Sequence, residues 1–260
     1  MRGYYGILTG LAIAVSLSGT VLAQTGVGSG AAPLPAPRKQ PQVAEGTLAP
    51  QVRDTAVRPA SATTVVQLGS PGLSATTRQV EDYFNDLNSL QADFTQSVTG
   101  EKVDSKGVFS LQRPGKFLWQ YMTPVKQRII STGSAVYYHD QERNQVTQLP
   151  MNAGVARLFN AKRLNLSQQG LRAVRVQSNS TMLAVEFAVD KKIATGDNTG
   201  LTDLRLTFAK LPGNNLQLRQ IDAVDTLSVT TRVAFANVKE NIPLAKSLFA
   251  FTPGVYDQRN

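Results

Sequence analysis

The 260-residue chain contains no cysteine and only one histidine, His139. Without cysteine there is no disulfide, so the fold depends on buried apolar side chains, and one histidine cannot supply the usual zinc sites. The chain also lacks a glycine-rich phosphate-binding loop. His139 precedes Asp140, but no nearby nucleophile completes a catalytic group, so we predict an exposed turn histidine. The sequence therefore predicts no enzyme, no catalytic residue, no metal site and no cofactor.

Long runs of like charge are absent as well. The formal net charge is +9, yet no basic run is longer than the pairs Lys162-Arg163 and Lys191-Lys192. Nucleic-acid-binding proteins concentrate positive charge in a patch or stripe. We therefore expect no nucleic-acid partner, and a basic surface that favours anionic membranes or acidic partners.

Residues 1–23 have the features of an export signal. Arg2 supplies the positive charge, Ile7–Leu22 is mostly apolar, and Ala23 ends a plausible cleavage site. Threonine, serine and glycine interrupt the apolar run, whereas a membrane span needs about 20 apolar residues. We expect removal of this signal peptide and a periplasmic protein; an uncleaved anchor is the alternative. Gln24 stands where lipid attachment would require cysteine, so the protein itself is not expected to be a lipoprotein.

Residues 24–75 are rich in proline, alanine, glycine and serine, and contain no aromatic residue. Such a segment cannot bury enough apolar surface to offset the entropy lost on ordering. We predict a disordered linker over 24–75, followed by a folded domain over 76–260.

The folded domain begins with a helical pattern and continues with a period of two. Thr76 and Gln79 suit a capping box, and an i, i+3, i+4, i+7 apolar face predicts a helix up to about Asn88. The helical face consists of Val80, Tyr83, Phe84 and Leu87. Strands are expected near residues 90–99, 106–112, 116–121, 127–132, 135–139, 144–149, 173–178, 182–191, 201–210, 216–224 and 228–238.

Short connections between these strands favour antiparallel neighbours. Helical spacing interrupts the strands at 151–161, and a last short helix is expected at 243–249. We therefore predict an α+β fold with one large, curved antiparallel sheet. Strongly twisted sheets of this size curl or close, and a curled sheet can enclose a ligand cavity.

The stretch LQRPGKFLWQYMTP, residues 111–124, has the strongest aromatic pattern in the chain. Phe117, Trp119 and Tyr121 alternate with other residues and predict one aromatic face of a strand. Arg113 stands just before them, followed by Pro114-Gly115.

This stretch, together with LNSLQADFTQSV before it and GSAVYYHDQERNQVTQL after it, resembles the periplasmic outer-membrane lipoprotein carrier (LolA) family. The most specific part of the resemblance is Arg113-Pro114-x-x-Phe117-x-Trp119, and the likeness covers most of residues 76–256. The other matching positions are Phe94-Thr95-Gln96, Gly107 and Gln145-Val146.

The resemblance implies an unclosed barrel of about eleven strands, covered by a few helices, with an apolar hollow for the acyl chains of lipoproteins. It implies an inner-membrane ABC complex that releases the cargo and an outer-membrane receptor that accepts it; we expect a monomer. It assigns Arg113 to closing a lid, formed by residues 151–164, through backbone carbonyls. The expected cavity lining is Phe94, Phe117, Trp119, Ile130, Tyr138, Leu149, Phe187, Leu206 and Phe235.

Purely structural roles for these residues, and other functions of the fold, stay open at this point. Arg113 can be an ordinary exposed arginine at a strand end, and Phe117 and Trp119 can be plain core residues. The same fold can also serve a lipid-binding or lipoprotein-sensing module with a different cargo. A receptor role is disfavoured, because the chain has no cysteine for a lipid anchor.

Overall fold

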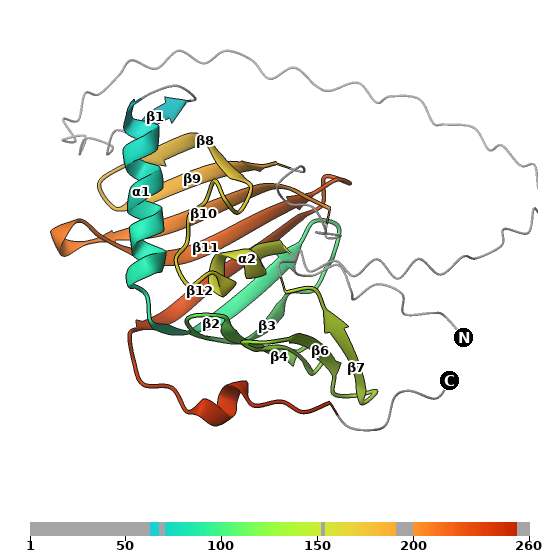
Figure 1. Cartoon of the computed structure of the whole chain (residues 1–260). Coiled ribbons are helices and arrows are strands. Elements are labelled where there is room, and N and C mark those ends of the chain that lie inside the picture. Colours follow the sequence, from blue (N-terminus) through green and yellow to red (C-terminus); the bar gives the residue numbers. More distant parts are fainter. Residues whose placement is uncertain (1–62, 68–70, 152–153, 191–199, 254–260) are drawn as a thin grey trace, which may run out of the picture. The chain divides into compact units, whose positions relative to one another are not determined.

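A twelve-stranded antiparallel sheet forms the main element of the computed structural model, which describes residues 63–67, 71–151, 154–190 and 200–253 (Figure 1). The spatial order is β1-β8-β9-β10-β11-β12-β2-β3-β4-β5-β6-β7. The strands are β1 (Thr64–Gln67), β2 (Ser89–Val98), β3 (Ser105–Gln112), β4 (Lys116–Thr123), β5 (Gln127–Thr132), β6 (Val136–Asp140), β7 (Gln145–Leu149), β8 (Leu171–Ser178), β9 (Met182–Val189), β10 (Leu201–Leu211), β11 (Asn215–Asp225) and β12 (Thr230–Glu240).

The sheet curves but does not close, because β1 and β7 are its two edges and do not pair with each other. All strand pairs are antiparallel, as the short connections predicted. The expected curved, unclosed sheet is confirmed, with β1 added to the eleven predicted strands.

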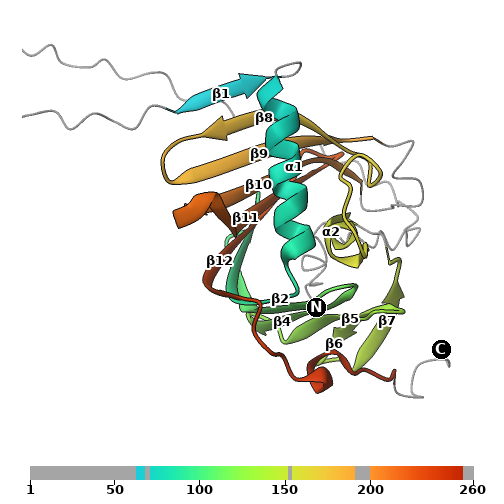
Figure 2. The ribbon, with the colours of Figure 1, turned by 60° about the vertical axis from the view of Figure 1, so that its left-hand side comes forward.

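Helix α1 and a shorter helical segment cover the inner face of the sheet (Figure 2). Helix α1 (Pro71–Asp86) lies across β8 to β11. The 3-10 turn η1 (Gly154–Ala156) and the short helix α2 (Arg157–Asn160) belong to the connection between β7 and β8. Two further 3-10 turns, η2 (Pro212–Asn214) and η3 (Lys246–Phe249), lie in the β10–β11 hairpin and after β12.

Ordered structure begins earlier than the predicted boundary at Thr76. Helix α1 starts at Pro71, where proline suits the first helical turn because its fixed φ is already helical. The hydroxyl of Thr76 donates to the Gly72 carbonyl at 2.9 Å, so Thr76 lies inside the helix and does not cap it. Strand β1 also falls within the predicted linker. The predicted signal peptide and residues 24–62 lie outside the described residues.

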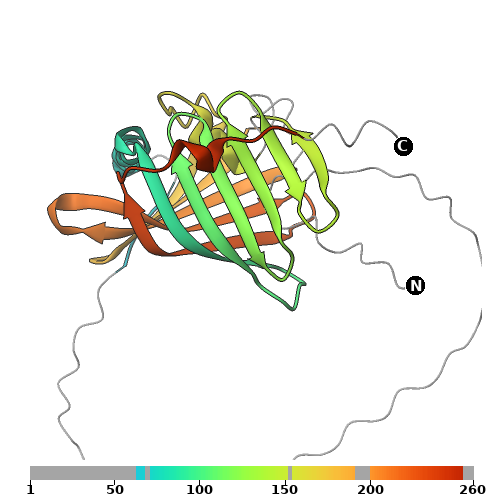
Figure 3. The same cartoon turned by 90° about the horizontal axis from the view of Figure 1, so that it is seen from below.

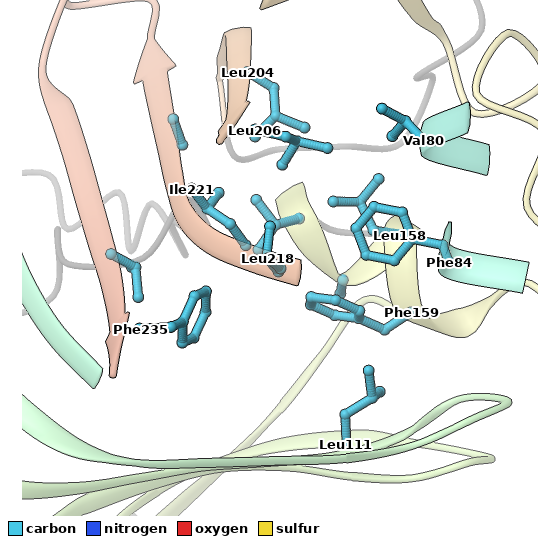
Figure 4. Close-up of a cluster of buried hydrophobic side chains, with 14 of the residues drawn as sticks. Val80, Phe84, Leu111, Leu158, Phe159, Leu204, Leu206, Leu218, Ile221 and Phe235 are labelled. Carbon is cyan, nitrogen blue, oxygen red and sulfur yellow. The ribbon is translucent and has the colours of Figure 1, made fainter. Parts of the chain in front are cut away.

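The core lies between α1, α2 and the inner face of the sheet (Figure 4). Val80 and Phe84 of α1 have no exposed surface, which confirms the buried helix face expected from their spacing. Phe84 makes edge contacts with Phe159 of α2 and Phe208 of β10, each at 6.3 Å between ring centroids. One apolar cluster therefore joins both covering elements to the strands.

A second, smaller cluster lies on the outer face of the sheet. Leu118 and Ile130 pack there against Phe249, Leu244 and Leu248 of the chain that follows β12. Figure 3 shows this C-terminal segment crossing the outer face over the neighbouring strands β4 to β6. The outer cluster buries the second face of β4 and β5, whose other face already belongs to the core.

Candidate functional site

The inner face of β2, β3 and β4 is aromatic. Trp119 stacks on Phe109 with ring centroids 4.1 Å apart and planes at 29°, and meets the edge of Phe94 at 5.2 Å. Tyr121 contacts Phe94 at 5.0 Å, and its hydroxyl donates to the buried Gln96 at 2.9 Å. Burial, reinforced by Tyr138, raises the pKa of Tyr121 above its ordinary value. The aromatic face predicted from the period of two is therefore buried, with its one inward hydroxyl satisfied.

Eight of the nine predicted lining residues belong to this inner cluster. Tyr138 is partly buried against it, and its hydroxyl donates to Gln127 at 2.9 Å. The other seven are at most 6% exposed: Phe94, Phe117, Trp119, Leu149, Phe187, Leu206 and Phe235. The structure thus brings these side chains together, while their contact with a ligand stays a prediction.

Ile130 is the exception, and its expected place in the lining is wrong. In the β4–β5 pairing Ile129 lies opposite Trp119 and Ile130 opposite Leu118. Cross-strand partners share a face, so Ile129 points inward and Ile130 belongs to the outer cluster. Ile129 and Ile130 are both buried, on opposite faces of β5, so two adjacent isoleucines do not show which one points inward. Ile129 is the inward residue that sequence reasoning missed.

A covering segment, residues 154–166, closes the inner cluster. Phe159 of this segment contacts Phe109 at 5.4 Å and Phe117 at 6.1 Å, besides Phe84 of α1. Figure 4 shows Leu158 and Phe159 gathered with Phe84 among the strand residues. Leu158 and Phe159 are 0% and 1% exposed, so the covering segment fills the centre of the interior with its own side chains.

Arg113, at the turn between β3 and β4, holds this segment by its carbonyl groups. Its Nη1 donates to the Leu158 carbonyl at 3.1 Å and its Nη2 to the Ala161 carbonyl at 2.8 Å. The Gly115 amide adds a bond to the Phe159 carbonyl at 3.0 Å. Burial lowers the pKa of Arg113 below its ordinary value. The structure therefore brings Arg113 to the covering segment, in the arrangement that the resemblance implied.

Helix α1 holds the other end of the covering segment. The Leu164 amide donates to Asn85 Oδ1 at 2.7 Å, and Asn85 Nδ2 donates to the Leu164 carbonyl at 3.1 Å. The Leu166 amide donates to Glu81 Oε1 at 2.7 Å. Sequence reasoning missed Asn85 and Glu81, because polar positions on an amphipathic helix ordinarily face water.

Gly107, one of the matching positions of the resemblance, allows the strands to approach closely. A Cβ at this position would lie 1.9 Å from the Gln120 carbonyl oxygen and 2.9 Å from the Phe94 ring. Glycine is therefore the residue that lets the Phe94 ring pack over β3.

Two of the surface pockets formed by the described residues lie outside the aromatic interior. One, of about 660 Å³, lies at the bulge in β12 beside β2 and β3 and includes Asp93, Asn237 and Lys239. The other, of about 390 Å³, lies between α1 and the β10–β11 hairpin and includes Tyr83 and Glu240. None of the nine predicted lining residues borders either pocket. Neither of these two pockets therefore opens onto the predicted lining.

His139 does not lie in an exposed turn, as the sequence suggested. It is half-buried in β6, where Arg128 bonds its Nδ1 at 3.0 Å and Phe251 packs against its ring at 5.5 Å. Within the described ranges, no group of His, Asp or Glu side chains is arranged to hold a metal ion. No helix in this part of the chain has both the length and the hydropathy needed to cross a membrane.

The chain is similar in sequence to known lipoprotein carriers. The family model for "Outer membrane lipoprotein carrier protein LolA" matches residues 85–252. Proteins named outer-membrane lipoprotein carrier protein from Methylococcus capsulatus and Chromobacterium violaceum are each 30% identical to the chain, over 188 and 193 residues. These matches cover 67% and 72% of this chain, and 82% and 87% of the relatives.

Among solved structures, a LolA superfamily protein from Nitrosomonas europaea is similar with a TM-score of 0.40 and 10% identity. The match covers 69% of this chain and 97% of that chain.

Proposed function

Because the chain belongs to the LolA family of outer-membrane lipoprotein carrier proteins, we propose that it shields the acyl chains of lipoproteins while they cross the periplasm. One observation carries the proposal: an interior built of apolar side chains is closed by a short segment that Arg113 holds through carbonyl groups. Such a segment can leave and return without disturbing the strands that form the interior.

The energetics favour exchange between the covering segment and an acyl chain. Burying a leucine or phenylalanine side chain contributes about 1.5–3 kcal/mol each, so Leu158 and Phe159 together contribute about 3–6 kcal/mol. Each buried acyl methylene contributes about 0.8 kcal/mol, so about ten methylenes offset the burial of both side chains, and further methylenes offset the two Arg113 hydrogen bonds that break on opening. An acyl chain can thus displace these two side chains, and they can return once it has left.

In this proposal the acyl chains occupy the space of Leu158 and Phe159 and contact the eight inward residues of the predicted lining, together with Ile129. The contacts are non-directional, so the protein part of the cargo need not be recognised there. We propose that an inner-membrane ABC complex releases the cargo and that an outer-membrane receptor accepts it. The carrier itself binds no nucleotide and catalyses no reaction.

Site-specific crosslinking tests the proposal. A photoreactive amino acid at Phe159 should crosslink to acylated lipoproteins in cells that express the full chain. The same amino acid at Asp203, which is exposed on β10, should give no such adduct. Crosslinks to free lipids without lipoproteins would favour the lipid-binding alternative, and equal adducts at both positions would refute the assigned interior.

A further inference from the structure

Strand β8 becomes the edge of the sheet when the short strand β1 leaves it. We propose that this edge pairs with the extended peptide that follows the acylated residue of a cargo lipoprotein, and that β1 occupies the edge until the peptide displaces it. The inference rests on the proposed carrier function, and it adds a contact with the polypeptide part of the cargo.

Strand β1 shows that the β8 edge accepts an extended segment. The two strands are antiparallel, with Thr64 opposite Ser178 and Gln67 opposite Arg175. Thr64 is exposed and Val65 is 51% exposed, so these two side chains bury little surface against the domain. At these positions the contact is mainly one of backbone with backbone, which is how a peptide adds to a sheet edge.

The same features make β1 easy to displace. It has four residues, and a net contribution of about 0.5–1.5 kcal/mol for each hydrogen bond is offset in part by the entropy of ordering its backbone. An incoming peptide replaces these bonds with equivalent ones, so the exchange costs little.

The position of β8 suits a peptide that leaves the interior. The covering segment leads through Gly170 into Leu171, the first residue of β8. A polypeptide attached to acyl chains beneath the covering segment would meet this end of β8 first. Strand β1 pairs with Arg175–Ser178, the half of β8 farther from the covering segment. The Leu171 amide already donates to the Leu166 carbonyl at 2.8 Å, so a peptide that pairs from Arg172 onwards would approach β1 from one end and replace it residue by residue.

Backbone pairing also fits the chemistry of the cargo. A carrier for many lipoproteins meets many sequences after the acylated residue, and all of them have the same main-chain donors and acceptors. Edge pairing takes its affinity from these groups, so it requires no particular side chain.

A reversible lock on β1 tests the inference in the full chain. The protein has no cysteine, so Val65→Cys with Gln177→Cys introduces one cross-strand pair that oxidation can join. The probes are a synthetic diacylated peptide with a ten-residue tail, the same lipopeptide with N-methylated tail amides, and the diacyl group without a tail. We expect the reduced protein to bind the unmodified tail about tenfold more tightly than the methylated one, because methylation removes the donors.

In the oxidised protein this tenfold difference should disappear, while affinity for the tail-less probe stays unchanged. Equal preference for the unmodified tail in both redox states would overturn the inference. Failure of the tail-less probe to bind either state would instead contradict the proposed acyl-chain site.

A second variant gives a change of opposite sign and does not depend on the disulfide. Successive amides of a strand alternate in direction, so Val65→Pro with Val66→Pro removes one donor toward β8 whichever way the alternation runs. Released β1 should increase affinity for the unmodified lipopeptide and leave the tail-less probe unaffected. Unchanged or weaker binding of the unmodified lipopeptide would overturn the inference.

Discussion

Asn85 holds the backbone of Leu164 by both of its polar groups, accepting from the amide at 2.7 Å and donating to the carbonyl at 3.1 Å. Arg113 holds the carbonyls of Leu158 and Ala161 in the middle of the covering segment. The segment is thus held at Leu158 and Ala161 by a charged side chain and at Leu164 by a neutral one. We propose that Arg113 releases when the segment opens and that Asn85 keeps its far end on α1.

Substitution of Arg113 by leucine should favour the open state. Hydrogen bonds from a charged donor contribute about 1.5–3 kcal/mol each, so amides of residues 154–166 should exchange at least tenfold faster with solvent. Affinity for a diacyl probe should rise, because less energy is needed to reach the open state, and transfer to an acceptor should fall. Arg113→Lys keeps the charge but loses the planar guanidinium that reaches both carbonyls. Its exchange rates should lie between those of the parent and of Arg113→Leu. Unaltered exchange in Arg113→Leu would contradict this role.

Substitution of Asn85 by alanine should loosen the covering segment at Leu164. It leaves the amide and carbonyl of Leu164 without their partner, which costs about 1–3 kcal/mol, and hydrogen exchange should increase most at Leu164. Asp82→Ala is a matched control, because Asp82 lies on the same helix and is exposed. If the Leu164 amide exchanges at the same rate in both variants, Asn85 does not hold the covering segment.

Truncation of Phe159 should separate stability from binding. Phe159→Ala and Phe249→Ala each remove a buried ring, from residues that are 1% and 2% exposed, and each should cost about 3–5 kcal/mol of unfolding free energy. Only Phe159→Ala should bind a diacyl probe more tightly, because Phe249 lies in the outer cluster. A similar gain in Phe249→Ala would show that general loosening, rather than the vacated interior, admits the probe.

The pH dependence of stability should include a contribution from Glu240. Burial raises the pKa of Glu240, whose Oε1 accepts from the Tyr83 hydroxyl at 2.6 Å. The folded state thus favours the protonated acid. This contribution is full below the ordinary carboxyl pKa and is lost as pH rises through the raised value. Glu240→Gln should be more stable than the parent at pH 7 and less pH-dependent above about pH 4.5. Denaturation curves with parallel pH profiles would exclude this contribution.

The local pattern was enough to predict the inner face of the sheet. Phe117, Trp119 and Tyr121 alternate along one strand and lie on the inner side, and Val80 and Phe84 lie on the buried side of their helix. Arg113 could be placed only through the family resemblance. Its partners are carbonyls 45 and 48 residues away, and no local pattern identifies them.

The wrong and missing predictions share a physical cause. Ile130 was misplaced because a distant segment covers the outer face of β5, so burial there has no period of two. Strand β1 was missed because its backbone pairing needs no apolar pattern. Asn85 and Glu81 were missed because tertiary contacts, not spacing, direct these polar side chains to the covering segment.

The outer cluster also constrains the order in which the chain can finish folding. Leu118 and Ile130 are covered only when Phe249, more than a hundred positions later in the sequence, packs against them. Until then an assembled sheet presents an apolar stripe that other unfolded chains can bind. A polypeptide truncated just after β12 would therefore aggregate, although every strand of its sheet is present.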